Sequence, residues 1–163
     1  IGILAAVGVV AYNGYTGAAK KAVVKQNFET TVKYFAHEVA LCDVDSGHKA
    51  FNLSCPVKVN VDFQTCAAIH LSWKYGIRNP NFPEEQHRKD MTANAPGGGC
   101  KVTTQGKDRG GVRSGDGQVD GDVNIVVCPR SPYCGSEASG KFKIMWWWDN
   151  NTMQDSAILD GNL

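Results

Sequence analysis

The first 41 residues contain no proline and carry two different patterns of apolar residues. From Ile1 to Tyr12 almost every side chain is apolar, and no charged residue precedes Lys20. After Lys20 the apolar residues recur at steps of three or four, which is typical of one face of a helix. They are Val24, Phe28, Val32, Phe35 and Val39. The sequence therefore predicts one helix over residues 1–41, roughly 60 Å long at 1.5 Å per residue.

A helix of this length must project from its own domain, because a compact domain of this size has a radius of gyration of about 15 Å. The striped half suits packing on a sheet, whereas the half that is apolar all round needs lipid or copies of itself. The run from Ile1 to Tyr12 falls short of the roughly 20 residues that span a bilayer. It also lacks the charged start and the cleavage site of a signal peptide. We expect the apolar run to continue upstream of Ile1, and we predict a protruding part (1–22) and a head (23–163).

The segment IGILAAVGVVAYNGYTGAAKKA (1–22) resembles the N-terminal helix of type IV pilins and pseudopilins. Family members begin further upstream, with a methylated Phe and a Glu that correspond to no residue here. The resemblance implies a major pilin, held in the bacterial inner membrane, assembled by the pilus machinery and homopolymerised into an extracellular helical filament. The assembly residues that it implies are Ile1, Ile3, Leu4, Val7, Val9, Val10, Tyr12 and Tyr15.

The resemblance also bears on the continuity of the helix. Family members carry a proline where Val10 stands, and their helix loosens in filaments between that proline and the glycine matching Gly2. This chain has no such proline, but it has Gly2 and Gly8, and a glycine inside a helix costs about 1 kcal/mol relative to alanine. We predict an extended or irregular stretch near Gly2–Gly8 in the filament only.

The remaining residues predict an α+β head, in which an antiparallel sheet packs on the second half of the long helix. Residues 61–76 are expected to form a second helix with Asp62 as its N-cap. Three strand-like runs bounded by glycine follow, at 100–105, 121–128 and 140–148. Their short connections favour antiparallel pairing.

Six cysteines without a C-x-x-C motif indicate disulfides and an oxidising compartment. They are Cys42, Cys55, Cys66, Cys100, Cys128 and Cys134. Fifteen pairings are possible, and the sequence does not choose among them. Closure entropy favours the short loop between Cys42 and Cys55. The segment from Cys128 to Cys134 resembles the disulfide-bounded region of many pilins, and these two pairs would leave Cys66 with Cys100.

An acidic loop, SGDGQVDGDVN (114–124), places oxygen-bearing side chains at alternate positions. This spacing resembles the first half of an EF-hand, but Val127 stands where a bidentate Glu should close the site. Some type II secretion pseudopilins hold calcium in their C-terminal loops. Calcium is therefore the one cofactor considered, with Asp116, Asp120 and Asp122 as its ligands. A hydrated turn between strands is the favoured interpretation.

Three tryptophans in MWWWDNN (145–151) form a second candidate feature. In a strand, Trp146 and Trp148 share one face and Trp147 takes the other. Packing on the helix or between subunits is favoured over a sugar-binding patch. The sequons that begin at Asn52 and Asn150 occur about as often as chance allows, so the sequence alone gives them no weight.

Two alternatives to a pilin remain open. One is a type II secretion pseudopilin; the other is a membrane-tethered binding module that uses the tryptophans or the acidic loop. No catalytic motif is present, so the chain is not expected to be an enzyme. The net charge of +1 gives no support for nucleic-acid binding.

Overall fold

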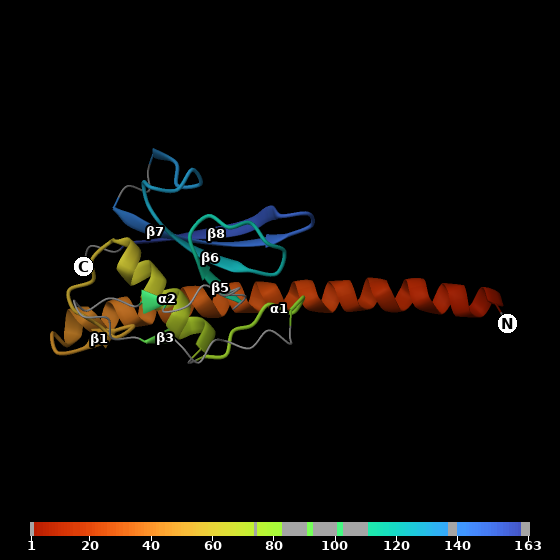
Figure 1. Ribbon diagram of the computed structural model, residues 1–163, viewed down its shortest axis with the longest axis horizontal. Helices are drawn as coiled ribbons and strands as arrows, with labels where there is room; N and C mark the ends of the chain where they lie inside the picture. The colour runs from red at the N-terminus through yellow and green to blue at the C-terminus, as the bar shows by residue number, and fades with distance from the viewer. Residues whose placement is uncertain are drawn as a thin grey trace.

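The longest element of the described structure is an N-terminal helix. The computed structural model describes residues 2–73, 75–82, 91–92, 101–102, 111–136 and 140–160. The first element, α1 (Gly2–Val44), has 43 residues and is about 65 Å long at 1.5 Å per residue. The described elements of the head lie beside its C-terminal half, and its N-terminal half extends beyond them (Figure 1). This confirms the predicted α+β arrangement of a protruding helix and a head.

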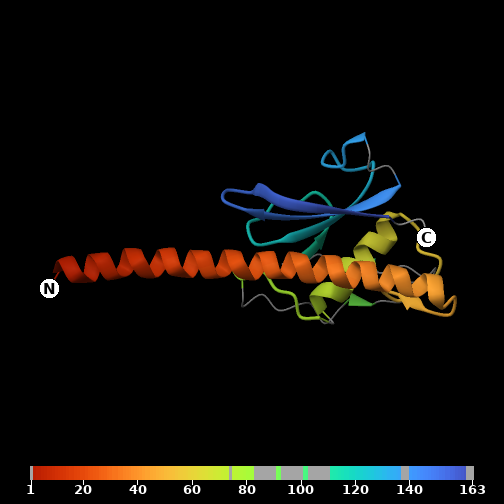
Figure 2. The ribbon, with the colours of Figure 1, turned by 180° about the vertical axis from the view of Figure 1, so that it is seen from behind.

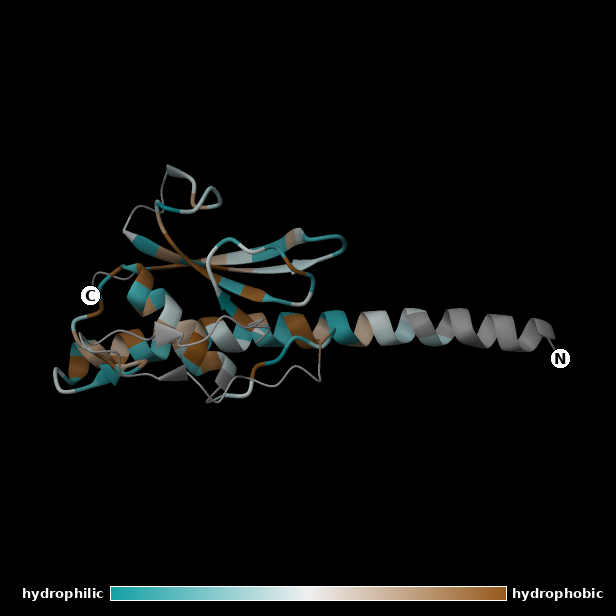
Figure 3. Ribbon diagram, in the orientation of Figure 1, coloured by the Kyte–Doolittle hydropathy of each residue, from teal (hydrophilic) through white to brown (hydrophobic). Residues whose placement is uncertain are grey.

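The head packs on one face of α1. The side chains on this face are at most 7% exposed: Val24, Phe28, Thr31, Phe35 and Val39. Val32, which the sequence placed in the stripe, is only half-buried. At 3.6 residues per turn, Thr31 lies nearer the centre of this face than Val32 does. In Figure 3 the apolar positions of α1 beneath the head alternate with hydrophilic ones.

A four-stranded sheet lies on this face of α1. Its strand order is β5 (Val112–Ser114), β6 (Val123–Val127), β7 (Lys141–Trp148) and β8 (Thr152–Asp160). The β6–β7 and β7–β8 pairs are antiparallel, as predicted, but β5 runs parallel to β6. The sheet is therefore mixed.

Two smaller strand pairs accompany this sheet. The first joins β1 (Lys49–Ala50) to β2 (Leu53–Ser54), and the second joins β3 (Met91–Thr92) to β4 (Lys101–Val102). The strand predicted at 100–105 is thus seen at Lys101–Val102, and its remaining residues lie outside the described part of the chain.

Both helices cover the same face of the sheet. The second helix, α2 (Val61–Trp73), contacts β5 and β6, while α1 contacts β6 and β7. Phenylalanines meet between these layers, with Phe35 at the centre. Its ring centroid lies 4.9 Å from that of Phe142 and 5.6 Å from those of Phe51 and Phe63. One aromatic cluster therefore joins α1, α2, the β1–β2 turn and the sheet.

The opposite face of the sheet has its own small core. Val126, Met145 and Trp147 are at most 2% exposed there, and the loop between Cys128 and Cys134 packs over them. The ring of Tyr133, from the same loop, lies 5.2 Å from Trp147. The disulfide loop therefore covers the face that the helices leave open.

The N-cap of α2 is Asn60 rather than the predicted Asp62. Asn60 Oδ1 accepts a hydrogen bond of 2.8 Å from the backbone N–H of Phe63, as an N-cap does for the third helical residue. Asp62 lies in the first turn, where a carboxylate favours the positive end of the helix dipole. The sequence assignment was wrong because α2 begins one residue before Asp62.

Replacing Asn60 with Ala is expected to lower the free energy of unfolding by about 1 kcal/mol, because the Phe63 N–H loses its acceptor. Asn60→Gly is the matched control and should cost only a few tenths of a kcal/mol. Urea denaturation of the two variants measures the difference. Equal stability of Asn60→Ala and the wild type would show that the cap contributes nothing.

Two predicted disulfides are present. Cys42 at the end of α1 is joined to Cys55, with Cα atoms 5.4 Å apart, and Cys128 is joined to Cys134. Cys66 is also disulfide-bonded. Its predicted partner, Cys100, lies outside the described residues, so that pair remains a prediction.

Replacing both Cys42 and Cys55 with Ser is expected to lower the free energy of unfolding by about 3 kcal/mol. The bond closes a loop with a sequence separation of 13, and its loss releases the unfolded chain. Denaturation of the double variant without reductant tests this value. A loss below 1 kcal/mol would mean that the unfolded chain stays compact in this segment.

Candidate functional site

The protruding half of α1 is the first candidate site. Tyr12 is 69% exposed and Tyr15 is 76% exposed, and these are two of the most exposed large hydrophobic side chains among the described residues. The view from behind shows the same free stretch of helix, with no described element of the head alongside (Figure 2). Further along α1, Lys21 interacts with the head, and its Nζ lies 2.8 Å from Asp149 Oδ2.

The assembly residues implied by the pilin resemblance fall into two groups. The side chains of Ile1, Ile3, Leu4, Val7, Val9 and Val10 lie outside the described residues, whereas Tyr12 and Tyr15 are described and exposed. The backbone is helical throughout Gly2–Gly8. Loosening of this stretch in a filament remains a prediction about the assembled state.

The acidic loop is the second candidate site, and its centre is Asp122. This side chain is fully buried between β5 and β6. Its Oδ1 accepts a hydrogen bond of 2.6 Å from Asn79 Nδ2, and its Oδ2 lies 2.5 Å from Nε of Arg113. A buried carboxylate of this kind requires such partners. Asp122 therefore holds the segment after α2 against the sheet.

Asp120 holds a different segment. Its two carboxylate oxygens accept hydrogen bonds from the backbone N–H groups of Asn150 and Asn151, in the turn between β7 and β8. Its carbonyl oxygen accepts from the side-chain amides of Asn79 and Asn81. Asp116, the third predicted ligand, is exposed. The three carboxylates thus lie in three different environments.

Asn79 and Arg113 were not predicted as members of this site. Asn79 stands in an Asn-Pro-Asn segment, a composition typical of surface loops, yet its side chain is fully buried. The one sequence feature that fits the buried Asn79 amide is Gly121, whose φ in the structure is +93°. An added Cβ there would lie 2.2 Å from Asn79 Oδ1, so the loop needs glycine to admit the amide.

Within the described residues, no group of three or more His, Cys, Asp or Glu is placed to hold a metal ion.

Replacing Asp122 with Ala is expected to lower the free energy of unfolding by about 3 kcal/mol, because Arg113 loses its ion partner. The same loss in calcium and in chelator would support a structural role for Asp122. A calcium-induced rise in the wild-type melting temperature that Asp116→Ala removes would instead establish the calcium site.

The tryptophans are packing residues. Trp146 is 5% exposed and joins the helix-facing core, and Trp148 packs against the same cluster. Trp147 is 2% exposed on the opposite face. This confirms the predicted division of faces, and neither Trp146 nor Trp147 offers an open ring for stacking on a sugar.

The titratable side chains of His48 and Tyr75 lie close to Glu38 on α1. The rings of Tyr34 and Tyr75 stack with centroids 4.1 Å apart, and the His48 ring nitrogen lies 3.0 Å from Glu38 Oε2. Burial raises the pKa of the Tyr75 phenol, and the Glu38 charge, Tyr34 and a hydrogen bond to Glu38 raise it further. Glu38 therefore ties α1 to the segments around β1 and α2.

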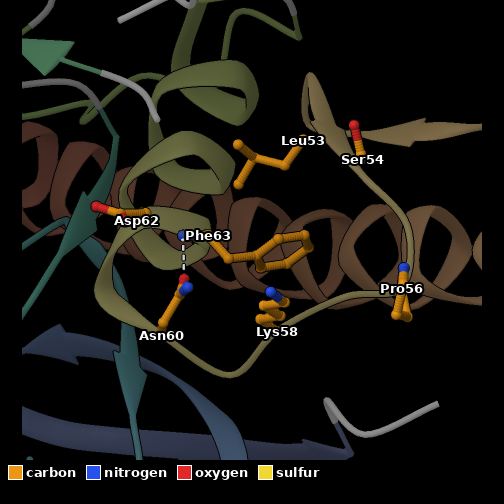
Figure 4. A pocket seen from close by; sticks show the side chains of 7 residues that line it. All are labelled: Leu53, Ser54, Pro56, Lys58, Asn60, Asp62 and Phe63. Atoms are coloured by element: carbon orange, nitrogen blue, oxygen red, sulfur yellow. Dashed lines mark hydrogen bonds between the residues drawn. The ribbon is translucent and has the colours of Figure 1, made fainter. Parts of the chain in front are cut away.

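A pocket of about 300 Å³ lies at the N-terminus of α2 (Figure 4). It is lined by Leu53, Ser54, Pro56, Lys58, Asn60, Asp62 and Phe63. Phe63 is only 2% exposed, so its ring is not available for stacking. Lys58 and Asp62 give the pocket one charge of each sign, which favours no single class of ligand.

No family model, curated protein or solved structure matches this chain. Among the helices in the described part of the chain, none is both long and apolar enough to cross a membrane.

Proposed function

We propose that this chain is a structural subunit of a type IV pilus, a major pilin that polymerises by helix–helix packing. The unassembled subunit resides in the bacterial inner membrane, and the pilus machinery assembles it into an extracellular filament. The observation that carries the proposal is the free N-terminal half of α1, with exposed Tyr12 and Tyr15 and no charge before Lys20. The resemblance of residues 1–22 to pilins supports the same conclusion.

The energetics favour burial of this helix among copies. Apolar surface contributes roughly 25 cal/mol per Å² when removed from water, so several hundred Å² per subunit give on the order of 10 kcal/mol before ordering costs. A helix that is apolar on all sides contacts several neighbours at once, as in a filament core. The disulfides suit the same setting, because a small exported head gains stability from them.

Electron microscopy of material sheared from the producing cells tests the proposal. Thin fibres that contain this chain, and that disappear when its gene is deleted, are the expected result. Absence of fibres, with the chain held in the membrane fraction, would overturn it. A pseudopilin or a tethered module would then be the better assignment.

A further inference from the structure

The described asparagine side chains divide into two groups. Most form side-chain hydrogen bonds within the fold: Asn27, Asn60, Asn79, Asn81, Asn124 and Asn151. Asn52 and Asn150 are exposed, and neither side chain bonds to another described residue. The side-chain amides of Asn52 and Asn150 are thus exposed to solvent, whereas those of the other asparagines named here form hydrogen bonds within the fold.

Asn150 lies at the centre of the turn between β7 and β8. The turn residues Asp149, Asn150 and Asn151 have φ values of 54°, 61° and 58°. The flanking side chains are engaged, since Asp149 pairs with Lys21 and Asn151 Oδ1 accepts from the Asp120 N–H. The backbone N–H of Asn150 donates to Asp120 Oδ2. The turn therefore fixes the backbone of Asn150 and leaves its amide exposed.

Asn52 has an equivalent position in the turn between β1 and β2. Its φ is 68°, and its backbone N–H donates to the Lys49 carbonyl oxygen at 3.3 Å. The preceding residue, Phe51, is 2% exposed and belongs to the aromatic cluster. The Cys42–Cys55 disulfide closes the same segment. This asparagine is also held by its backbone with a free side chain.

The same two asparagines begin the sequons. Asn52 is followed by Leu and Ser54, and Asn150 by Asn and Thr152, which fits the N-x-S/T acceptor motif for N-linked oligosaccharides. None of the bonded asparagines is followed by Ser or Thr at the second position. Ser54 and Thr152 are exposed as well. The acceptor motif and the free amides therefore coincide at both sites.

We propose that Asn52 and Asn150 are acceptors for N-linked oligosaccharide. In the transfer, Nδ2 of the asparagine attacks C1 of an oligosaccharide carried on a lipid diphosphate. The N–C1 bond forms, the bond between C1 and the diphosphate oxygen breaks, and the departing lipid diphosphate takes up the proton that the amide loses. The reaction needs export of the chain but does not depend on filament assembly.

Mass spectrometry of the chain purified from its producing cells tests the proposal. The intact chain should exceed its sequence mass by glycan increments, and peptides that contain Asn52 and Asn150 should carry them. Thr152→Ala should remove the increment at Asn150, whereas Thr152→Ser should keep it. Ser54→Ala and Ser54→Thr form the corresponding pair for Asn52.

Glycine variants separate modification from turn structure. Asn150→Gly and Asn52→Gly keep a residue that accepts positive φ, so the turns should persist while the increments disappear. An unmodified wild-type mass would overturn the proposal, as would increments that none of these variants removes. Occupancy of a single site would confirm that site and overturn the other.

Discussion

Replacing Phe35 with Ala is expected to lower the free energy of unfolding by about 3–5 kcal/mol, the largest loss at any single side chain discussed above. Phe35 is fully buried, and its ring contacts those of Phe51, Phe63 and Phe142. Its loss leaves a cavity where three segments of the head meet α1. Urea denaturation followed by tryptophan fluorescence measures the change.

Tyr15→Ala provides the matched control, since it also removes an aromatic ring from α1. Tyr15 is 76% exposed, so its replacement should change the stability of the isolated chain by no more than about 0.5 kcal/mol. If both variants lost equal stability, the aromatic cluster would not be the centre of the core.

Replacing Tyr12 and Tyr15 together with Glu is expected to abolish filaments without unfolding the head. Both side chains lie on the free part of α1, and the proposed assembly buries them among neighbouring helices. Burial of two unpaired carboxylates costs several kcal/mol, so the filament yield should fall by more than about tenfold. Electron microscopy and the sheared fraction of the chain measure this yield.

Val44→Glu is the control for position along the same helix. Val44 is 81% exposed at the opposite end of α1, where the proposed assembly buries no helix core. Filaments should persist in this variant. If they persisted in the Tyr12/Tyr15 double variant as well, packing of the free helix would not drive assembly.

The long helix and its buried stripe could be predicted because the signal is local. A proline-free run with apolar steps of three and four specifies both the element and the face that packs. The strands β6 and β7 were predicted for a similar reason, since each is a continuous run of strand-forming residues bounded by glycine. In both cases the neighbouring residues carry all the information that the prediction requires.

The features that could not be predicted depend on contacts between distant segments. β5 has only three residues and pairs in parallel with β6. This pairing is accompanied by two long-range interactions: α2 packs on both strands, and the Asn79 side chain donates a hydrogen bond to Asp122. The polar alternation of residues 114–124 suggested an ion site, but burial of Asp122 against Arg113 is a tertiary outcome. β8 could not be predicted because the first half of its sequence, Thr152–Ser156, contains a single apolar residue, Met153, and shows no alternation.

The position of the Cys42–Cys55 bond has a mechanical consequence. A force that pulls on the N-terminal end of α1 is directed along the helix axis, so it loads the contacts from Val24 to Val39 in shear rather than one after another. Shear divides the tension among all these contacts at once. Once they yield, the tension reaches Cys42, where the disulfide passes it directly to Cys55, so the enclosed loop that contains β1 and β2 is shielded from the force.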